Sequence, residues 1–279
     1  MQISRRSLLG GGGAALLARR LAARARLKIG VTDWNLHLTG KVDAVETAAR
    51  LGFDGVQVSL GRKPVDGRLP LDDLATQQEY LTASKIQKIA LDGTCLDILH
   101  VNYLKNDKLG QKWVADSIPV TRKLDARVVL LPFFGKGALT TRDEMDYVGD
   151  VLREIAPEAE KVGVILGLED TISAEDNVRI MERTKSPAVL TYYDVGNSTE
   201  AGFDVVKEIR WLGRDRICQI HLKDNPHYLG EGKIDFRAVV KAIEDIGFHG
   251  YANLETDSPS KSVEDDMIRN LHFIRRLIG

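Results

Sequence analysis

The sequence is short of cysteine, of long apolar runs and of net charge. Its 279 residues include only Cys95 and Cys218 as cysteines. No segment has the ~20 consecutive apolar residues of a membrane-spanning helix. Lysine plus arginine (39) nearly equal aspartate plus glutamate (40), so the formal charge is −1 and the basic excess of nucleic-acid-binding proteins is missing. We therefore expect neither nucleic acid nor membrane as a partner of the mature chain.

The first 25 residues differ in composition from the rest. The twin arginines Arg5 and Arg6 precede a glycine-rich, weakly apolar segment that ends in small residues near Ala25. This order is typical of a twin-arginine (Tat) export signal, so we predict a signal peptide over 1–25 and a periplasmic or otherwise exported mature chain, 26–279. The alternative is a basic extension that stays on the protein.

Apolar segments and helical periodicities alternate through the mature chain. Strands are predicted at 27–34, 52–60, 91–99, 126–134, 163–170, 188–194, 217–221 and 251–255, and helices at 42–51, 71–90, 109–124, 142–162, 173–184, 203–212, 235–246 and 263–274. Eight strands each followed by a helix predict an α/β protein, a single-domain (β/α)8 TIM barrel. A doubly wound open sheet is the alternative, but no G-x-G-x-x-G follows the first strand.

Three local features sharpen this prediction. Pro157 lies inside the predicted helix 142–162, and because proline removes a helix donor we expect a kink or a break near Ala156. Gly52 and Gly247 each follow a helix and precede an aromatic residue, a second glycine and a strand, as left-handed helix C-caps do. The two cysteines fall in the third and seventh strands, on opposite sides of the ring, so we expect two free, buried thiols.

Four consecutive predicted strands end in side chains that bind metals. These are Glu169, Asp194, His221 and Glu255, separated by 25 to 34 residues, close to the ~31 expected for one βα unit. Three carboxylates in one pocket repel one another by ~4 kcal/mol per pair at ~4 Å, and a divalent cation removes that cost. Oxygen donors with one imidazole favour Mn2+, Mg2+ or Co2+, and leave Zn2+ open. The alternative is that each is an ordinary solvated strand-end group.

Polar residues also occur one layer below the predicted ligands. Counting back by two places Gly167, Tyr192, Gln219 and Asn253 toward the barrel interior. Gln219 and Asn253 are either core amides satisfied by the backbone or supports for the metal ligands.

The motifs GLED at Glu169, YDVGN at Asp194, IHLKD at His221 and NLET at Glu255, with GEGKIDF at 230–236, resemble the sugar phosphate isomerase/epimerase family. These are xylose isomerase-like TIM barrels and include the ketose 3-epimerases. The resemblance spans the mature chain and is specific in its second half. It implies that the four residues bind the metal, and that the two glutamates are the acid and base on opposite faces of a metal-bound ketose.

The chemistry that this resemblance implies is proton abstraction from, and return to, a carbon next to a carbonyl. A cation that holds the carbonyl oxygen stabilises the enediolate, which makes the proton removable. Glu169 and Glu255 would take and return it, so the resemblance implies a metal-dependent carbohydrate isomerase or epimerase.

The resemblance is incomplete at the substrate. Asn197 stands where epimerases of the family commonly have histidine, and His227 lies near the position of an arginine. Both still offer hydrogen bonds to a substrate. On the second strand, Gln57 replaces a glutamate found in many relatives.

Three further residues are candidate substrate contacts. Trp34 and His37 follow the first strand, where they form either a wall for a sugar or ordinary loop packing. Lys223 either holds a substrate oxygen or pairs with Asp224. We interpret His100, after the third strand, as a loop histidine satisfied by its surroundings.

Several functions fit this constellation. An exported isomerase or epimerase acting on a free sugar or keto-sugar is the leading hypothesis, because sugar phosphates are cytoplasmic metabolites. A lyase that carries out β-elimination on keto-glycosides, and a non-catalytic sugar-binding barrel, are the alternatives. A trinuclear zinc endonuclease would need more histidines at the barrel mouth. The sequence leaves open whether the protein is a homo-oligomer.

Overall fold

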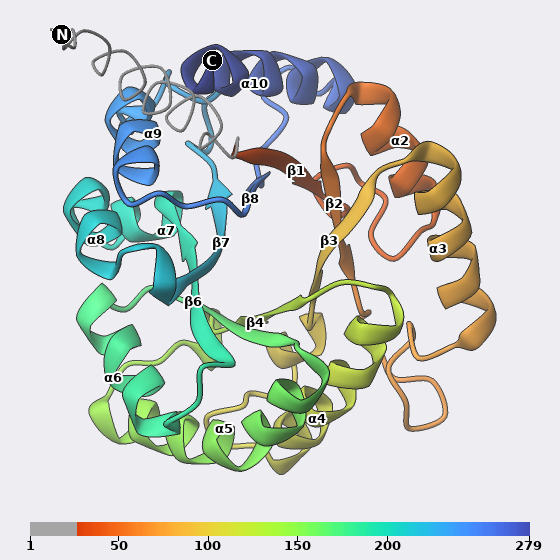
Figure 1. Cartoon of the computed structure of the whole chain (residues 1–279), viewed down its shortest axis with the longest axis vertical. Helices are drawn as coiled ribbons and strands as arrows, with labels where there is room; N and C mark the ends of the chain where they lie inside the picture. Colours follow the sequence, from red (N-terminus) through yellow and green to blue (C-terminus); the bar gives the residue numbers. More distant parts are fainter. Residues whose placement is uncertain (1–26) are drawn as a thin grey trace, which may run out of the picture.

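Eight parallel strands form a closed barrel in the order β1 to β8, and helices surround it (Figure 1). The computed structural model describes residues 27–279, so the predicted export signal, 1–25, lies outside the described residues and stays a prediction. The strands are β1 (Lys28–Thr32), β2 (Gly55–Ser59), β3 (Ala90–Cys95), β4 (Val128–Pro132), β5 (Ile165–Glu169), β6 (Val189–Asp194), β7 (Ile217–Leu222) and β8 (Tyr251–Leu254). The predicted (β/α)8 barrel is confirmed.

Each strand is followed by at least one helix. The helices are α2 (Asp43–Leu51), α3 (Leu74–Gln87), α4 (Lys108–Lys123), α5 (Arg142–Val162), α6 (Ala174–Thr184), α7 (Val195–Glu200), α8 (Val205–Leu212), α9 (Phe236–Asp245) and α10 (Val263–Ile278), with short 3-10 turns at Asp97–His100, Gly135–Gly137 and Arg214–Arg216. The short helix α7 was not predicted. Within residues 27–279, no helix has the length and apolar character needed to span a bilayer.

Helix α5 runs without interruption past Pro157, so the predicted break near Ala156 is wrong. Proline leaves the carbonyl four residues earlier, that of Arg153, without its helical donor. Both Arg153 and Pro157 are exposed, so water can satisfy that carbonyl on the outer face of the helix. A capping box at Thr141 also secures the start of the helix.

The predicted left-handed turns after α2 and α9 are confirmed. Gly52 has φ 92° and Gly247 has φ 68°, values that strain residues with a Cβ. Each glycine stops its helix and turns the chain toward the next strand.

Two apolar cores hold the barrel. The larger one lies between the strands and the helices, as expected for strands β2 and β4, which are buried along their whole length. The smaller one lies inside the ring and includes Cys95 and Tyr192, with Trp34 and Cys218 packed against it. Both cysteines are free, as predicted, but only Cys95 is fully buried, so the prediction of two buried thiols is half wrong.

A buried carboxylic acid, Asp92, lies in the interior of the barrel. Its Oδ1 accepts a bond of 3.1 Å from Asn253 Nδ2, and its Oδ2 has no partner among the described residues. A Cβ on Gly30 would stand 2.0 Å from Asn253 Oδ1 and 2.2 Å from Asp92 Oδ2, so only glycine fits there. Burial raises the pKa of Asp92 to about 8, and a proton on Oδ2 would be close to the unpartnered Asn253 Oδ1.

Asp92 therefore makes stability depend on pH. Since the pKa rises from ~3.9 in the unfolded chain to about 8 in the folded one, the folded state keeps a proton that the unfolded state releases between these values. The free energy of unfolding should fall by ~1.4 kcal/mol per pH unit across that range. Asp92→Asn should lose this slope in urea unfolding at pH 5 to 8, whereas the exposed Asp66→Asn should keep it. A difference between wild type and Asp92→Asn that stays constant with pH would contradict this assignment.

Candidate metal centre

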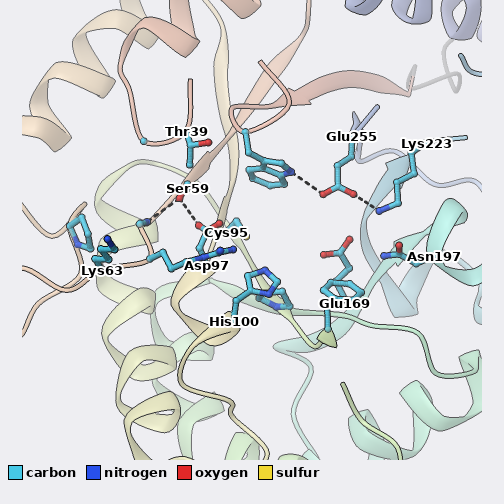
Figure 2. A pocket seen from close by; sticks show the side chains of 17 residues that line it. Thr39, Ser59, Lys63, Cys95, Asp97, His100, Glu169, Asn197, Lys223 and Glu255 are labelled. Carbon is cyan, nitrogen blue, oxygen red and sulfur yellow. Dashed lines mark hydrogen bonds and ion pairs between the residues drawn. The ribbon is translucent and has the colours of Figure 1, made fainter. Parts of the chain in front are cut away.

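The C-terminal ends of the strands open into a pocket of about 800 Å³. Figure 2 shows Glu169, Asn197, Lys223 and Glu255 on one side of it. Trp34 also lines the pocket, so five of the predicted site residues share one cavity. Glu169 is the last residue of β5, and Glu255 directly follows β8. Asn197 lies in α7, after β6, and Lys223 directly follows β7.

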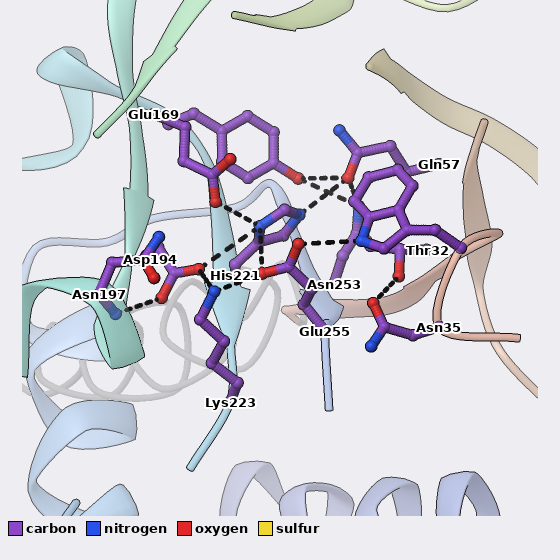
Figure 3. A network of polar contacts seen from close by, with 12 residues as sticks. Thr32, Asn35, Gln57, Glu169, Asp194, Asn197, His221, Lys223, Asn253 and Glu255 are labelled. Carbon is purple, nitrogen blue, oxygen red and sulfur yellow. Dashed lines mark hydrogen bonds and ion pairs between the residues drawn. The ribbon is translucent and has the colours of Figure 1, made fainter. Parts of the chain in front are cut away.

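The four predicted metal ligands converge at this end. One ligand atom from each of Glu169, Asp194, His221 and Glu255 lies within 4.8 Å of the others. Figure 3 shows the three carboxylates gathered around the imidazole ring. His221 and Asp194 are buried, whereas Glu169 and Glu255 also reach the pocket.

His221 turns one nitrogen toward the carboxylates and the other toward the barrel interior. Its Nδ1 lies 2.9 Å from Glu169 Oε1 and 3.4 Å from Glu255 Oε2. Its Nε2 lies 2.9 Å from Gln57 Oε1. Because an amide oxygen only accepts, Nε2 must carry a hydrogen and donate it, which leaves Nδ1 as the nitrogen able to bind a metal.

Gln57 is itself held by the layer below the site. Its Oε1 also accepts from Tyr192 OH at 3.0 Å and from Asn253 Nδ2 at 3.3 Å. Asn253 thus belongs to the support of the metal ligands, whereas Gln219 donates to the Asp92 backbone carbonyl at 2.9 Å and is a core amide. Of the two roles considered for these amides, Asn253 therefore has the supporting role and Gln219 is a core amide.

Asp194 is oriented by a helix that the sequence did not reveal. It is the N-cap of α7, and its Oδ1 accepts a bond of 2.8 Å from the backbone N–H of Asn197. Its Oδ2 lies 2.8 Å from Lys223 Nζ and 3.6 Å from His221 Nδ1. The cap therefore directs one carboxylate oxygen into the cluster.

Lys223 pairs with the cluster and not with its sequence neighbour. Its Nζ donates to Asp194 at 2.8 Å and to Glu255 at 2.6 Å. Asp224 instead accepts backbone bonds from Gly230, Gly232 and Lys233. Lys223 is therefore a fixed positive charge at the edge of the acidic site.

The pKa shifts within the cluster show that its carboxylates need positive charge beside them. Burial raises the pKa of Glu169 to about 7, against the opposing effect of His221. Burial would also raise the pKa of Glu255, but His221 and Lys223 outweigh it and hold that pKa well below its usual range. Burial would lower the pKa of His221, yet Glu255 and Glu169 raise it well above its usual value. Without an ion, the negative charge of the three carboxylates is thus offset by Lys223 and by a tendency of Glu169 and His221 to hold protons.

The residues present fit one divalent ion. Three carboxylates and one imidazole are a donor set typical of Mn2+, Mg2+, Co2+ or catalytic Zn2+. Asp194 Oδ2 faces only Lys223 Nζ, at 2.8 Å, and His221 Nδ1, at 3.6 Å, so it points into the cluster where an ion would bind. An ion held by Glu169, Asp194, His221 and Glu255 would take over the role of the proton on His221.

His37 and His227 lie apart from this pocket. His37 lines a shallower hollow with Pro226 and Asp257, and the exposed His227 lines another, behind Lys223. Neither lines the cavity that contains the glutamates. Their roles as substrate contacts remain predictions.

The opposite wall of the pocket was not predicted from the sequence. Ser59, Asp97 and His100 line it, and His100 stacks on Phe134 with ring centroids 6.3 Å apart. His100 is thus a pocket residue as well as a packed loop histidine. A signal was present for Ser59 alone, which lies two positions after Gln57 and continues the inward face of β2, whereas Asp97 and His100 lie in the turn after β3.

Comparison with known proteins agrees with this arrangement. The model of the family described as "Xylose isomerase-like TIM barrel" matches residues 45–277. A curated protein of Actinoplanes sp., named 2-epi-5-epi-valiolone 7-phosphate 2-epimerase, is 27% identical over 229 residues, which cover 77% of this chain and 82% of that protein.

Solved structures share the fold. An L-ribulose 3-epimerase superposes with a TM-score of 0.75 at 18% identity, covering 90% of this chain and 94% of that one. A D-allulose 3-epimerase from Methylomonas sp., in complex with D-allulose, gives a TM-score of 0.73 at 16% identity, covering 90% and 97%. At these identities the likeness concerns the barrel itself.

The contact between Gln57 and His221 predicts an effect on metal binding. Gln57→Leu removes the acceptor for His221 Nε2–H, so the affinity for Mn2+ should fall about 10- to 100-fold. Gln57→Glu keeps an acceptor and should retain more of the affinity. Gln219→Leu is the matched control, since this buried amide bonds the Asp92 carbonyl instead. Titration against a competing chelator measures all three, and equal weakening by both leucine variants would refute the assigned role.

Proposed function

The chain belongs to the xylose isomerase-like TIM barrel family, and from this premise we propose that it is a divalent-metal-dependent sugar isomerase or epimerase. The observation that carries the proposal is the convergence of Glu169, Asp194, His221 and Glu255, with both glutamates lining one pocket. The name of the curated relative, 2-epi-5-epi-valiolone 7-phosphate 2-epimerase, is consistent with this reaction class. A bound divalent ion would supply positive charge beside the oxygens of a carbonyl substrate, where negative charge develops when a neighbouring proton leaves.

Glu169 is the better placed of the two glutamates to take the proton. His221 bonds its Oε1, and its Oε2 has no hydrogen-bond partner among the described residues. Glu255 has donors on both oxygens, Trp34 Nε1 at 2.9 Å and Lys223 Nζ at 2.6 Å. These donors fix the Glu255 side chain at the end of β8. From there it would return a proton to the opposite face of the carbon that Glu169 deprotonates.

Three side chains are suited to orient the sugar. Asn197 Nδ2 is buried and has no partner among the described residues, so it can donate to a substrate oxygen without breaking a bond. Trp34 holds its indole edge on Glu255 and offers its ring as a wall. Lys223, between Asp194 and Glu255, sets the position of the glutamate and is within the same cavity. We assign these three residues to substrate positioning.

The two-glutamate mechanism predicts the loss of solvent exchange. Glu169→Gln and Glu255→Gln should each lower the incorporation of solvent deuterium into a reactive ketose by about 10²- to 10⁴-fold, because the amide cannot accept the proton. Mass spectrometry of a ketose panel measures the exchange, and metal content is measured in the same samples because the amide keeps one oxygen donor.

The control is Glu208→Gln. Glu208 is a buried carboxylate outside the pocket, and it accepts a hydrogen bond of 2.8 Å from the Tyr193 hydroxyl group. This variant should exchange at the wild-type rate, and removal of the ion by a chelator should stop exchange in wild type. Exchange that persists in both Glu169→Gln and Glu255→Gln would refute the mechanism. Product analysis separates epimerisation from β-elimination, in which the same proton loss is followed by departure of a leaving group.

We also propose that the protein is exported by the Tat route, from Arg5 and Arg6 ahead of the apolar segment. The double variant Arg5→Lys/Arg6→Lys should remain in the cytoplasm and keep its first 25 residues. The second arginine pair offers the control, because Arg19→Lys/Arg20→Lys keeps the twin-arginine motif and should be exported. Cell fractionation and N-terminal sequencing report both, and export of the first variant would exclude this route.

A further inference from the structure

The pocket is much longer than the metal cluster needs. Its volume of about 800 Å³ lies in the upper part of the ~300–1,000 Å³ range of pockets that bury drug-sized ligands, which are larger than one hexose. Figure 2 shows the glutamates at one side and Ser59, Asp97 and Thr39 at the other. A single sugar bound at the cluster would leave the second half to water.

The second half is a built polar site. Ser59 Oγ donates to Asp97 Oδ2 and accepts a bond of 3.0 Å from the backbone N–H of Gly61. Ser59 is 1% exposed, so its position is fixed by the strand that carries it. Burial raises the pKa of Asp97, against the opposing bond from Ser59. Asp97 thus presents a held carboxyl group to the cavity.

The walls beside this group are flat and apolar. Trp34, Pro132 and Phe134 line the same cavity, and His100 stacks on Phe134. A sugar ring presents C–H faces to such walls and hydroxyl groups to carboxyl and hydroxyl side chains. The second half therefore has both elements that hold a pyranose ring.

This end of the cavity carries charges of both signs. Asp97 offers a carboxyl group that accepts hydrogen bonds, and Arg62 and Lys63 line the same cavity from an exposed loop. Hydroxyl groups can donate to the carboxyl group and accept from the cations, so a ring with several hydroxyl groups fits both signs of charge, whereas an anion would fit the cations alone.

We infer that Ser59 and Asp97 form a second sugar subsite, and that the substrate is a glycosylated keto-sugar whose second ring occupies it. The inference rests on the proposed function for the reacting ring and adds a recognition element from β2 and the turn after β3. Ser59 and Asp97 are specificity residues here, because they lie across the cavity from the glutamates.

The test compares binding of fructose with binding of disaccharides in which fructose keeps a free carbonyl. Lactulose carries the second sugar on O4, isomaltulose on O6 and turanose on O3. Dissociation constants are measured by calorimetry on Mn2+-loaded protein, for wild type, Asp97→Asn, Ser59→Ala and Asp66→Asn. Asp66 is an exposed aspartate on the neighbouring loop, outside the cavity lining, and gives the matched charge control.

We expect at least one disaccharide to bind about tenfold more tightly than fructose, the effect of one or two hydrogen bonds to charged groups. Asp97→Asn and Ser59→Ala should each reduce that ratio several-fold, and Asp66→Asn should leave it unchanged. The inference is overturned if no disaccharide is preferred, or if the preference survives in both cavity variants. Absence of solvent exchange with every ketose would count against the proposed reaction alone, because the binding ratio does not depend on turnover.

Discussion

Repulsion among three carboxylates at the mouth of the barrel is the constraint on which the rest of the site depends. Glu169, Asp194 and Glu255 lie around one imidazole, and each is brought there by the end of a different strand. The arrangement is stable only if positive charge is placed among them. In the described structure Lys223 supplies part of it, the neighbouring glutamates raise the pKa of His221, and a divalent ion would supply positive charge more directly.

Residues inside the barrel hold the His221 ring so that its Nδ1 faces the carboxylates. Asp92 bonds Asn253, Asn253 bonds Gln57, and Gln57 accepts the hydrogen of His221 Nε2. Tyr192 closes the same network through its hydroxyl group. Such a network is favourable only when its members are satisfied, and a proton on Asp92 would remove the charge of its unpartnered Oδ2. The absence of a side chain at Gly30 leaves the room for it.

The sequence predicted the parts of the molecule that follow from strand periodicity. In a parallel barrel all strand ends meet at one rim, so carboxylates and a histidine at four successive ends had to come together. Two features were not predicted correctly from this periodicity. The expected break at Pro157 is absent because the freed carbonyl faces water, and α7 is too short to show a period.

The far wall of the pocket escaped for a different reason. Ser59 belongs to a strand but Asp97 and His100 belong to a turn, and their approach depends on how the loops after β2 and β3 fold over the rim. No spacing rule relates positions in two loops. The partner of Lys223 could not be predicted from sequence spacing either. Its neighbour Asp224 accepts hydrogen bonds from backbone N–H groups, and Lys223 pairs with the carboxylates of the cluster instead.

The arc β5 to β8 carries the reacting groups, whereas β2 and the turn after β3 carry the facing wall. A change at Ser59 or Asp97 can therefore alter which molecules fit the cavity while the four converging side chains keep their places. Selectivity and reaction chemistry can thus evolve independently within one barrel.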